Sequence, residues 1–299
     1  MKFQRIALIG GSGFVGSRLT HHLHNAGYQC RVLTRHASRH ADLRLSAETR
    51  EVDPYRANEL AAALDGCDAV INLVGILNPG PGGQDFRNVH VRLTENVVEA
   101  CHQNGIERLL HMSALHADQA TGSSEYLRSK GEGENRAHTL GKPDIGVTSF
   151  RPSVIFGPGD SFLNRFASLL RIPGPLPLAC WYARFAPVFV GDVVEAFTRA
   201  LPDRHTHGKH YELCGPDIYT LEEIVRLVGF HTRRYKEIIR LPDWAARVQA
   251  SLLQFAPGKP FTPDNFLSLQ TDSICTRNGL ADLGITPTPM ESLAAQYLQ

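Results

Sequence analysis

A tyrosine and a lysine four residues apart give the first indication of chemistry in this chain. They are Tyr126 and Lys130, in the stretch YLRSK. On a helix, this spacing places both side chains on one face. A free tyrosine titrates near about 10, so it needs a neighbouring cation before it exchanges protons at neutral pH. The pair therefore predicts an acid/base tyrosine with Lys130 as its partner, and the alternative is an ordinary exposed amphipathic helix.

A glycine-rich stretch near the start of the chain, RIALIGGSGFVGSRL, predicts a phosphate-binding loop. Gly10, Gly13 and Gly16 fit G-x-x-G-x-x-G, and Gly11 with the last two also fits G-x-G-x-x-G. Glycines allow a tight turn and a close approach of the backbone to a pyrophosphate, and the helix that follows offers unpaired N–H groups. The stretch lies between an expected strand and an expected helix, which favours a dinucleotide over a plain turn. No Gly-Lys-Ser/Thr follows, which excludes a P-loop.

The end of the second expected strand indicates which dinucleotide binds. An acidic residue there would accept a hydrogen bond from the ribose 2′-hydroxyl of NAD. The stretch VLTRHASRH has Arg35 instead, and no acid before Asp42. Arg35, assisted by Arg39, could pair with a 2′-phosphate and stack on adenine. This favours NADP(H), with NAD still open and a solvated basic loop as the alternative. Asp53 either contacts the adenine or serves as a turn residue before Pro54.

Strands and helices alternate through the first half of the chain. Short β-branched runs predict strands at 5–10, 28–35, 68–75 and 106–114, and helical spacing predicts helices at 17–27, 57–66 and 88–105. Such alternation predicts an α/β fold, a doubly wound parallel sheet with helices on both faces. After residue 152, loops rich in Pro and Gly introduce a smaller, mostly helical region. We expect a Rossmann domain at 1–152, to which 187–202 return, and a substrate domain at 153–299.

Composition narrows the class of protein. The chain has 299 residues, with 31 basic against 30 acidic ones, and its net charge of +1 gives no electrostatic case for a nucleic-acid partner. No apolar run reaches the ~18 residues of a membrane span, and the N-terminus lacks the features of a signal peptide. The six cysteines include no C-x-x-C pair and predict buried free thiols in a reducing compartment. We expect a cytoplasmic globular protein.

Five motifs together resemble the short-chain dehydrogenase/reductase superfamily: GGSGFVG, NLVGIL, HMSAL, YLRSKGEGE and RPSVIFGPGD. PVFVGDVVEAF and YELCGPDIYTLEEIV extend the resemblance over nearly the whole chain. Within the superfamily, the motifs resemble the extended, atypical branch that includes the nucleotide-binding accessory subunit of mitochondrial complex I and its bacterial relatives. The resemblance implies a Rossmann fold, an acid/base Tyr126 and a Lys130 that bonds the nicotinamide ribose. It also implies NADP(H) contacts at Gly10, Gly13, Phe14, Val15, Gly16 and Arg35, at Val74 and Gly75 under the adenosine, and at Arg151, Pro152 and Ser153 beside the nicotinamide.

Several positions depart from the pattern of that family. A Ser or Thr usually steadies the substrate oxygen at the end of the fifth strand, but here Ala114 falls at that position and Ser113 lies one residue earlier. Ser113 is kept as a candidate catalytic residue. His90 replaces the usual helical Asn. The bulky stretch Cys180–Tyr182, where relatives tend to have glycines, either fills the substrate pocket or reshapes it.

Two further stretches are interpreted without a function. The histidines of HTHGKH lie in a polar loop with no carboxylate or cysteine nearby in sequence, so no metal site is predicted. In PDWAARVQASLLQF, Trp244, Val248, Leu252 and Phe255 form one stripe. The stripe predicts core or a subunit contact, because a membrane-surface helix would carry more Lys and Arg.

Two classes of function fit the whole pattern. The first is an NADP(H)-dependent oxidoreductase that passes a hydride to or from a largely apolar carbonyl or quinone-type substrate. The second is a non-catalytic NADP(H)-binding accessory or sensor protein of a respiratory complex. Tyr126 and Lys130 favour the first class, and the missing Ser and Asn favour the second. We expect a monomer or homodimer, which could lie peripheral to a membrane respiratory complex.

Overall fold

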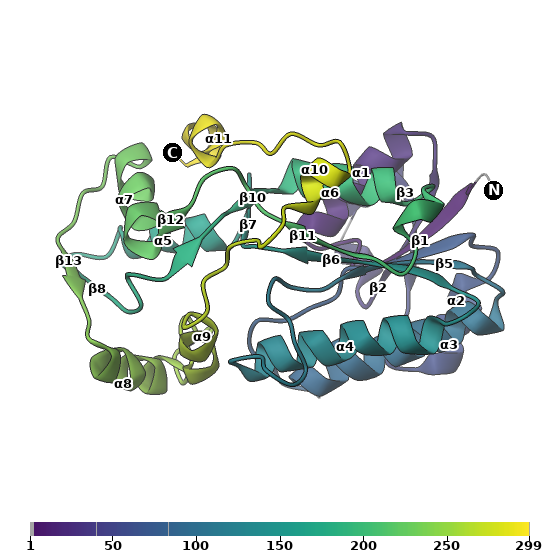
Figure 1. The fold of residues 1–299 in the computed structure, drawn as a ribbon, viewed down its shortest axis with the longest axis horizontal. Helices are drawn as coiled ribbons and strands as arrows, with labels where there is room; N and C mark the ends of the chain where they lie inside the picture. The colour runs from purple at the N-terminus through teal and green to yellow at the C-terminus, as the bar shows by residue number, and fades with distance from the viewer. Residues whose placement is uncertain (1–2, 40, 83, 299) are drawn as a thin grey trace.

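The computed structural model describes residues 3–39, 41–82 and 84–298 (Figure 1). Its centre is a seven-stranded sheet in the order β11-β6-β5-β4-β1-β2-β3, in which all neighbouring strands are parallel. The strands are β1 (Arg5–Ile9), β2 (Gln29–Thr34), β3 (Ala47–Glu51), β4 (Ala69–Asn72), β5 (Arg108–Met112), β6 (Gly146–Pro152) and β11 (His210–Leu213). The predicted doubly wound α/β sheet is confirmed.

Helices cover both faces of this sheet. On one face α3 (Leu93–Gln103) packs between α2 (Ala57–Leu64) and α4 (Glu125–Gly141), and on the other α1 (Phe14–Asn25) packs on α6 (Val190–Ala200) (Figure 1). Burial on both faces explains why β1 reads RIALI and β4 begins AVI. Short helical segments lie between these elements: the 3₁₀ helices η1 (Ala37–Arg39), η2 (Ala41–Leu45) and η4 (Arg204–Thr206), and the π-helix η3 (Arg87–Arg92). None of the helices in the described ranges is long and apolar enough to cross a bilayer.

The strand order reverses between β1 and β4. From β1 the sheet adds β2 and β3 on one side, and β4, β5, β6 and β11 on the other. At such a switch point the loops that leave the carboxyl ends of the two strands diverge and leave a crevice for ligands. The glycine-rich loop follows β1, and Val74 and Gly75 follow β4, so both segments lie at this crevice.

The remaining elements form a second, mostly helical region, towards the end of the long axis opposite the N-terminus (Figure 1). Its helices are α5 (Phe162–Leu169), α7 (Leu221–His231), α8 (Asp243–Leu253), α9 (Pro263–Ser268) and α11 (Met290–Tyr297). Its two-stranded ladders pair β7 (Ile155–Phe156) with β10 (Val188–Phe189), β9 (Arg184–Phe185) with β12 (Tyr219–Thr220), and β8 (Leu176–Leu178) with β13 (Ile238–Arg240). The predicted smaller helical region is confirmed, although β11 and the short α10 (Gly279–Asp282) beside it belong to the Rossmann layer.

Two of the six cysteines differ from the prediction of free thiols. Cys214, just after β11, forms a disulfide with Cys275, which lies 61 residues later in the chain. The prediction was wrong because it relied on spacing along the sequence, whereas the fold brings the end of β11 beside the C-terminal segment. The other four cysteines are free and buried, as predicted: Cys30, Cys67, Cys101 and Cys180.

The apolar stripe on α8 does not lie in the core of the chain. Its side chains are exposed, Trp244 by 73%, Val248 by 53%, Leu252 by 68% and Phe255 by 83%. Two alanines on the other side of the helix, at positions 246 and 250, are buried in the core of the second region instead. The core interpretation was wrong because small residues, which the pattern of large apolar side chains does not reveal, provide the packing face of this helix.

Candidate active site

Glycine geometry shapes the loop between β1 and α1. Gly10 has a φ of +81°, in the left-handed region that favours glycine, and a Cβ on Gly16 would lie 2.2 Å from the carbonyl oxygen of Gly10. Gly13 caps α1 without a side-chain bond and donates its N–H to that same oxygen at 3.1 Å. The first-turn N–H groups of Phe14, Val15 and Gly16 have no partner among the described residues. Such a helix start fits the pyrophosphate of a dinucleotide.

The residues predicted for the adenosine end lie at the surface beside this loop. Arg35, directly after β2, is exposed and forms no ion pair with a described residue. Burial raises the pKa of Tyr55, and the charge of Arg35 opposes that rise. Asp53 accepts the backbone N–H of Tyr55 at 3.1 Å, a turn contact before α2. Arg39, the predicted assistant of Arg35, has a side chain outside the described part of the chain.

Tyr126 and Lys130 share one face at the start of α4. Lys130 is only 4% exposed, and its Nζ donates to the carbonyl oxygen of Met112, at the end of β5, at 2.6 Å. A Cβ on Gly75 would lie 3.5 Å from this Nζ, so the ammonium group borders the segment after β4. The lysine therefore lies at the same crevice as the glycine-rich loop.

Burial sets the protonation of both groups. It raises the pKa of Tyr126 to about 12, and no charge of Lys130 opposes this rise. It lowers the pKa of Lys130 to about 8, against the opposing charge of Glu134. The expected depression of the pKa of Tyr126 is therefore absent, because the ammonium group is directed to the carbonyl oxygen of Met112. At neutral pH the tyrosine is protonated, which suits it to donate a proton.

The π-helical segment η3 presents His90 to this pair. The Nε2 of His90 accepts the backbone N–H of Ile76 at 3.1 Å, so the ring proton resides on Nδ1, 2.8 Å from the Oγ of Ser129. Ser129 in turn donates to the carbonyl oxygen of Tyr126 at 2.9 Å. Burial lowers the pKa of His90 to about 2. A neutral histidine therefore links the loop after β4 to the helical turn that carries the tyrosine.

Two glycines within α4 allow its close approach to neighbouring backbone. A Cβ on Gly133 would lie 2.2 Å from the carbonyl oxygen of His90, and a Cβ on Gly131 would lie 2.6 Å from the backbone of Asp118. Glycine inside a helix costs about 1 kcal/mol relative to alanine. The packing of α4 on η3, which positions His90, accounts for Gly133, and the packing of α4 on the backbone of Asp118 accounts for Gly131.

Ser113 has the one buried side-chain polar atom without a hydrogen-bond partner among the described residues. It directly follows β5, is 3% exposed, and donates its backbone N–H to the carbonyl oxygen of Phe150 at 2.7 Å. Buried hydroxyl groups are nearly always hydrogen-bonded, so this Oγ fits a contact with a bound ligand. Ala114, at the usual Ser/Thr position, is buried and has no hydroxyl to offer.

The three residues predicted beside the nicotinamide hold the carboxyl end of β6. The Nε of Arg151 pairs with the Oε2 of Glu134 on α4 at 2.9 Å. The carbonyl oxygen of Pro152 accepts a backbone N–H of the loop after β5 at 3.0 Å. The Oγ of Ser153 donates to the carbonyl oxygen of Ser273 at 2.8 Å. These contacts fasten the strand end to α4, to the neighbouring loop and to the C-terminal segment.

An apolar cavity of about 650 Å³ lies where the start of α4 meets the second region. Tyr126 lines it together with Leu77 and Asn78, from the loop after β4. The rest of the lining comes from α5, the proline-rich segment 172–179, α8, α9 and their neighbours, and it includes Val154, Phe162, Phe166, Leu169, Leu176, Leu178, Leu253, Phe261 and Leu269. A substrate in this space would meet apolar side chains over most of its surface and the candidate proton donor at one wall.

The bulky stretch Cys180–Tyr182 is absent from the described lining of this cavity. The ring of Trp181 packs under the guanidinium of Arg240 at 4.7 Å, and the hydroxyl of Tyr182 donates to Asp243 at 2.8 Å. These side chains brace β13 and the start of α8. They shape the second region without filling the cavity.

Comparison with known proteins identifies the family. Residues 6–214 match the NAD dependent epimerase/dehydratase family. The chain belongs to this family. Over 307 residues it is 30% identical to NADH dehydrogenase (ubiquinone) 1 alpha subcomplex subunit 9, mitochondrial, of Mus musculus, and the alignment covers 98% of the chain and 79% of the mouse protein.

The chain is also similar to a bacterial reductase and to an epimerase of known structure. The chain is 27% identical over 275 residues to ceramide reductase of Caulobacter vibrioides, with 87% of the chain and 81% of that protein covered. The structure of UDP-glucose 4-epimerase of Thermus thermophilus in complex with NAD matches with a TM-score of 0.77 at 19% identity, over 99% of this chain and 98% of the other, which shows the shared fold. As a member of the epimerase/dehydratase family, the chain is an NAD(P)-binding, oxidoreductase-like protein of the extended short-chain type.

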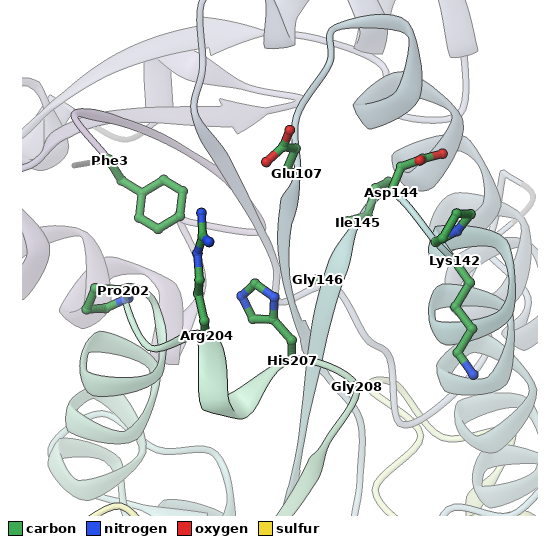
Figure 2. Close-up of a pocket in the computed structure, with 11 residues that line it drawn as sticks. Phe3, Glu107, Lys142, Asp144, Ile145, Gly146, Pro202, Arg204, His207 and Gly208 are labelled. Carbon is green, nitrogen blue, oxygen red and sulfur yellow. The ribbon is translucent and has the colours of Figure 1, made fainter. Parts of the chain in front are cut away.

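A second cavity, of about 420 Å³, lies at the opposite edge of the sheet (Figure 2). It is lined by Glu107 and Gly146, at the amino ends of β5 and β6, and by Arg204 and His207, whose side chains face it in Figure 2. Lys142 is directed away from it. Ligands of open α/β sheets bind at the carboxyl ends of the strands, so we assign this cavity no role in the chemistry of the family.

Proposed function

We propose that this protein is an NADP(H)-dependent reductase of a largely apolar ketone or quinone-type carbonyl compound. The observation that carries the proposal is the position of Tyr126, which lines an apolar cavity and shares a helix face with the buried Lys130. The similarity to ceramide reductase supports reduction of a compound with long alkyl chains.

The cofactor would lie along the crevice between β1 and β4. Its pyrophosphate fits the first-turn N–H groups of α1, and Arg35 is free to meet a 2′-phosphate. When bound, a reduced nicotinamide supplies a hydride to the carbonyl carbon of the substrate. The remaining residues proposed to hold the cofactor are Asp53, Val74, Gly75, Lys130, Arg151, Pro152 and Ser153.

Tyr126 would donate its phenolic proton to the carbonyl oxygen as the hydride arrives at carbon. The pKa of about 12 keeps this proton in place at neutral pH. Lys130, on the same helix face, would favour the phenolate that forms once its ammonium group leaves the carbonyl oxygen of Met112. The unpartnered Oγ of Ser113 would donate a hydrogen bond to the same substrate oxygen, a contact that Ala114 lacks.

A non-catalytic NADP(H)-binding accessory protein is the second candidate. Three observations favour it: Lys130 bonds to Met112 rather than to Tyr126, Ala114 has no hydroxyl, and the mouse relative is by name a subunit of NADH dehydrogenase. In this case the dinucleotide would stabilise the fold or an assembly, without turnover.

A series of substrates with increasing alkyl chain length distinguishes the reductase from the accessory protein. NADPH oxidation is measured with methyl ketones and quinones whose alkyl tails increase in length. For the reductase, kcat/KM rises about fourfold for each added methylene until the cavity is filled, because each buried CH₂ contributes about 0.8 kcal/mol. Tight NADPH binding with no turnover of any compound favours the accessory protein, and a rate independent of tail length contradicts the apolar cavity as the substrate site.

A further inference from the structure

The outer face of α8 carries an exposed stripe of large apolar side chains. Trp244, Val248 and Leu252 are spaced four residues apart, and Phe255 follows at the end of the helix. This spacing places them on one side of the helix, and all are more than half exposed. A contiguous apolar surface of this kind marks an interaction site for a protein or a membrane.

The same helix also lines the substrate cavity. Gln249 and Leu253 contribute to the cavity wall, and each follows a residue of the α8 stripe by one position, about 100° further around the helix. Ile172 also lines the cavity and is 58% exposed, so it belongs to both the wall and the surface. The α8 stripe therefore borders the cavity wall, and Ile172 extends from that wall to the surface.

Basic residues gather around this part of the molecule. Segment 230–259 holds six basic residues against two acidic ones, in a chain whose net charge is only +1. Arg233 and Arg234, between α7 and β13, and Arg171, next to Ile172, are exposed and form no ion pair within the described ranges. Figure 1 shows α8, β8 and β13 together at one end of the long axis. Lys and Arg are sparse on α8 itself, but the neighbouring segments supply them.

We propose that this end of the molecule docks on an anionic lipid bilayer, with the α8 stripe in the interfacial layer and Arg171, Arg233 and Arg234 among the headgroups. The charge of this surface points to an anionic lipid bilayer as the partner. Exposed apolar side chains that include a tryptophan bind such bilayers when unpaired cations flank them. The cavity mouth would then face the membrane, and an apolar substrate would pass from the bilayer to Tyr126. The docking proposal depends only on these surface residues, whereas the proposal of substrate transfer rests on the proposed function.

Vesicle sedimentation of the full chain tests docking without substrate or cofactor. Wild-type protein is expected to bind vesicles of phosphatidylcholine mixed with phosphatidylglycerol at least tenfold more tightly than vesicles of phosphatidylcholine alone, and to dissociate as salt rises. The double variant Val248→Glu, Leu252→Glu should lower binding at least tenfold. Leu140→Glu, at an exposed leucine on α4, is the matched control and should leave binding unchanged. Arg233→Ala should lower binding about fivefold.

Tryptophan fluorescence tests contact with the bilayer without relying on the amount of protein that sediments with the vesicles. The chain has two tryptophans, and Trp244 is the exposed one on α8. Lipids brominated on their acyl chains should quench its emission in the wild type and leave the emission of Trp244→Phe unchanged. No binding to either vesicle, or equal binding by the double glutamate variant, overturns the proposal. A wild-type dimer that this variant converts to a monomer, without vesicle binding, identifies the α8 stripe as an interface between copies and also overturns it.

Activity separates docking from the proposed function. If the protein is the reductase, the double glutamate variant should reduce a short, water-soluble ketone as fast as the wild type, and a long-chain ketone held in anionic vesicles at least tenfold more slowly. Vesicle binding without turnover of any ketone would contradict the reductase and leave docking intact. Equal rates on the vesicle-held ketone would overturn transfer from the membrane.

Discussion

Arg35 is the residue on which the choice of dinucleotide depends. It is exposed beside the glycine-rich loop and forms no ion pair with the described residues. Arg35→Ala should weaken NADPH binding about 10- to 100-fold, because a charge-assisted bond to phosphate contributes about 1.5–3 kcal/mol. NADH binding should stay unchanged. Calorimetric titration measures both, with Arg136→Ala on α4 as the control for loss of a surface charge, and equal loss of both nucleotides would contradict the assignment.

Lys130 links the stability of the protein to pH. Its pKa is about 8 in the folded chain, below the ordinary 10.5, so between these values the unfolded chain binds more protons and stability rises with pH. The free energy of unfolding of the wild type, relative to Lys130→Met, should therefore increase between pH 7.5 and 9.5 by on the order of 1–3 kcal/mol. Urea denaturation of both proteins across this range measures it. If the difference in the free energy of unfolding between the two proteins stays constant or falls, burial does not lower the pKa of Lys130.

Spacing along the sequence was sufficient to place Tyr126 and Lys130 on one helix face and the glycines in the loop before α1, because helices and tight turns relate nearby residues in a regular way. The link from Ile76 through His90 to Ser129 had no such signal. It joins three segments whose proximity depends on the π-helical turn and on the close approach of α4. The prediction of a lowered pKa for Tyr126 was wrong for a similar reason. It depended on the direction of the ammonium group of Lys130, which the sequence does not show.

At the scale of elements, the packing of α4 on η3 positions the candidate site. A Cβ on Gly133 would meet the carbonyl oxygen of His90, a backbone atom that cannot move aside alone. Gly133→Ala should therefore destabilise the protein by about 1–3 kcal/mol, although alanine is the better helix former. Thermal unfolding measures the change, and Asn135→Ala, exposed on the same helix, should be neutral or slightly stabilising. Unchanged stability of Gly133→Ala would contradict the close approach.

Alternating apolar strands and amphipathic helices made the Rossmann sheet predictable, since both periods are local. Three strands of the sheet, β3, β6 and β11, were not among the runs predicted from the sequence. Of these, β11 has only four residues, HYEL, which carry little pattern and lie within a region read as mostly helical. The helix α8 was misread for a complementary reason. Its large apolar residues suggested core, but its alanines provide the buried face.

At the scale of the whole molecule, the crevice of the sheet and the apolar cavity meet at one helix. The amino end of α4 carries Lys130 towards the crevice and Tyr126 towards the cavity wall. The bond between Ser153 and Ser273 and the disulfide between Cys214 and Cys275 fasten the C-terminal segment to the sheet edge beside them. No sequence pattern places these contacts, because each joins residues that are distant in the chain.

Transfer of deuterium from NADPH labelled at C4 tests the central claim most directly. With the longest-tailed ketone that is accepted, the wild type should place deuterium on the former carbonyl carbon. Tyr126→Phe should slow this transfer by about 10²- to 10⁴-fold, the range for loss of a positioned acid, while its affinity for NADPH stays within about twofold of the wild type. Transfer at the wild-type rate by Tyr126→Phe, or no transfer to any carbonyl compound despite bound NADPH, would contradict the claim that Tyr126 and the apolar cavity form a reductase site.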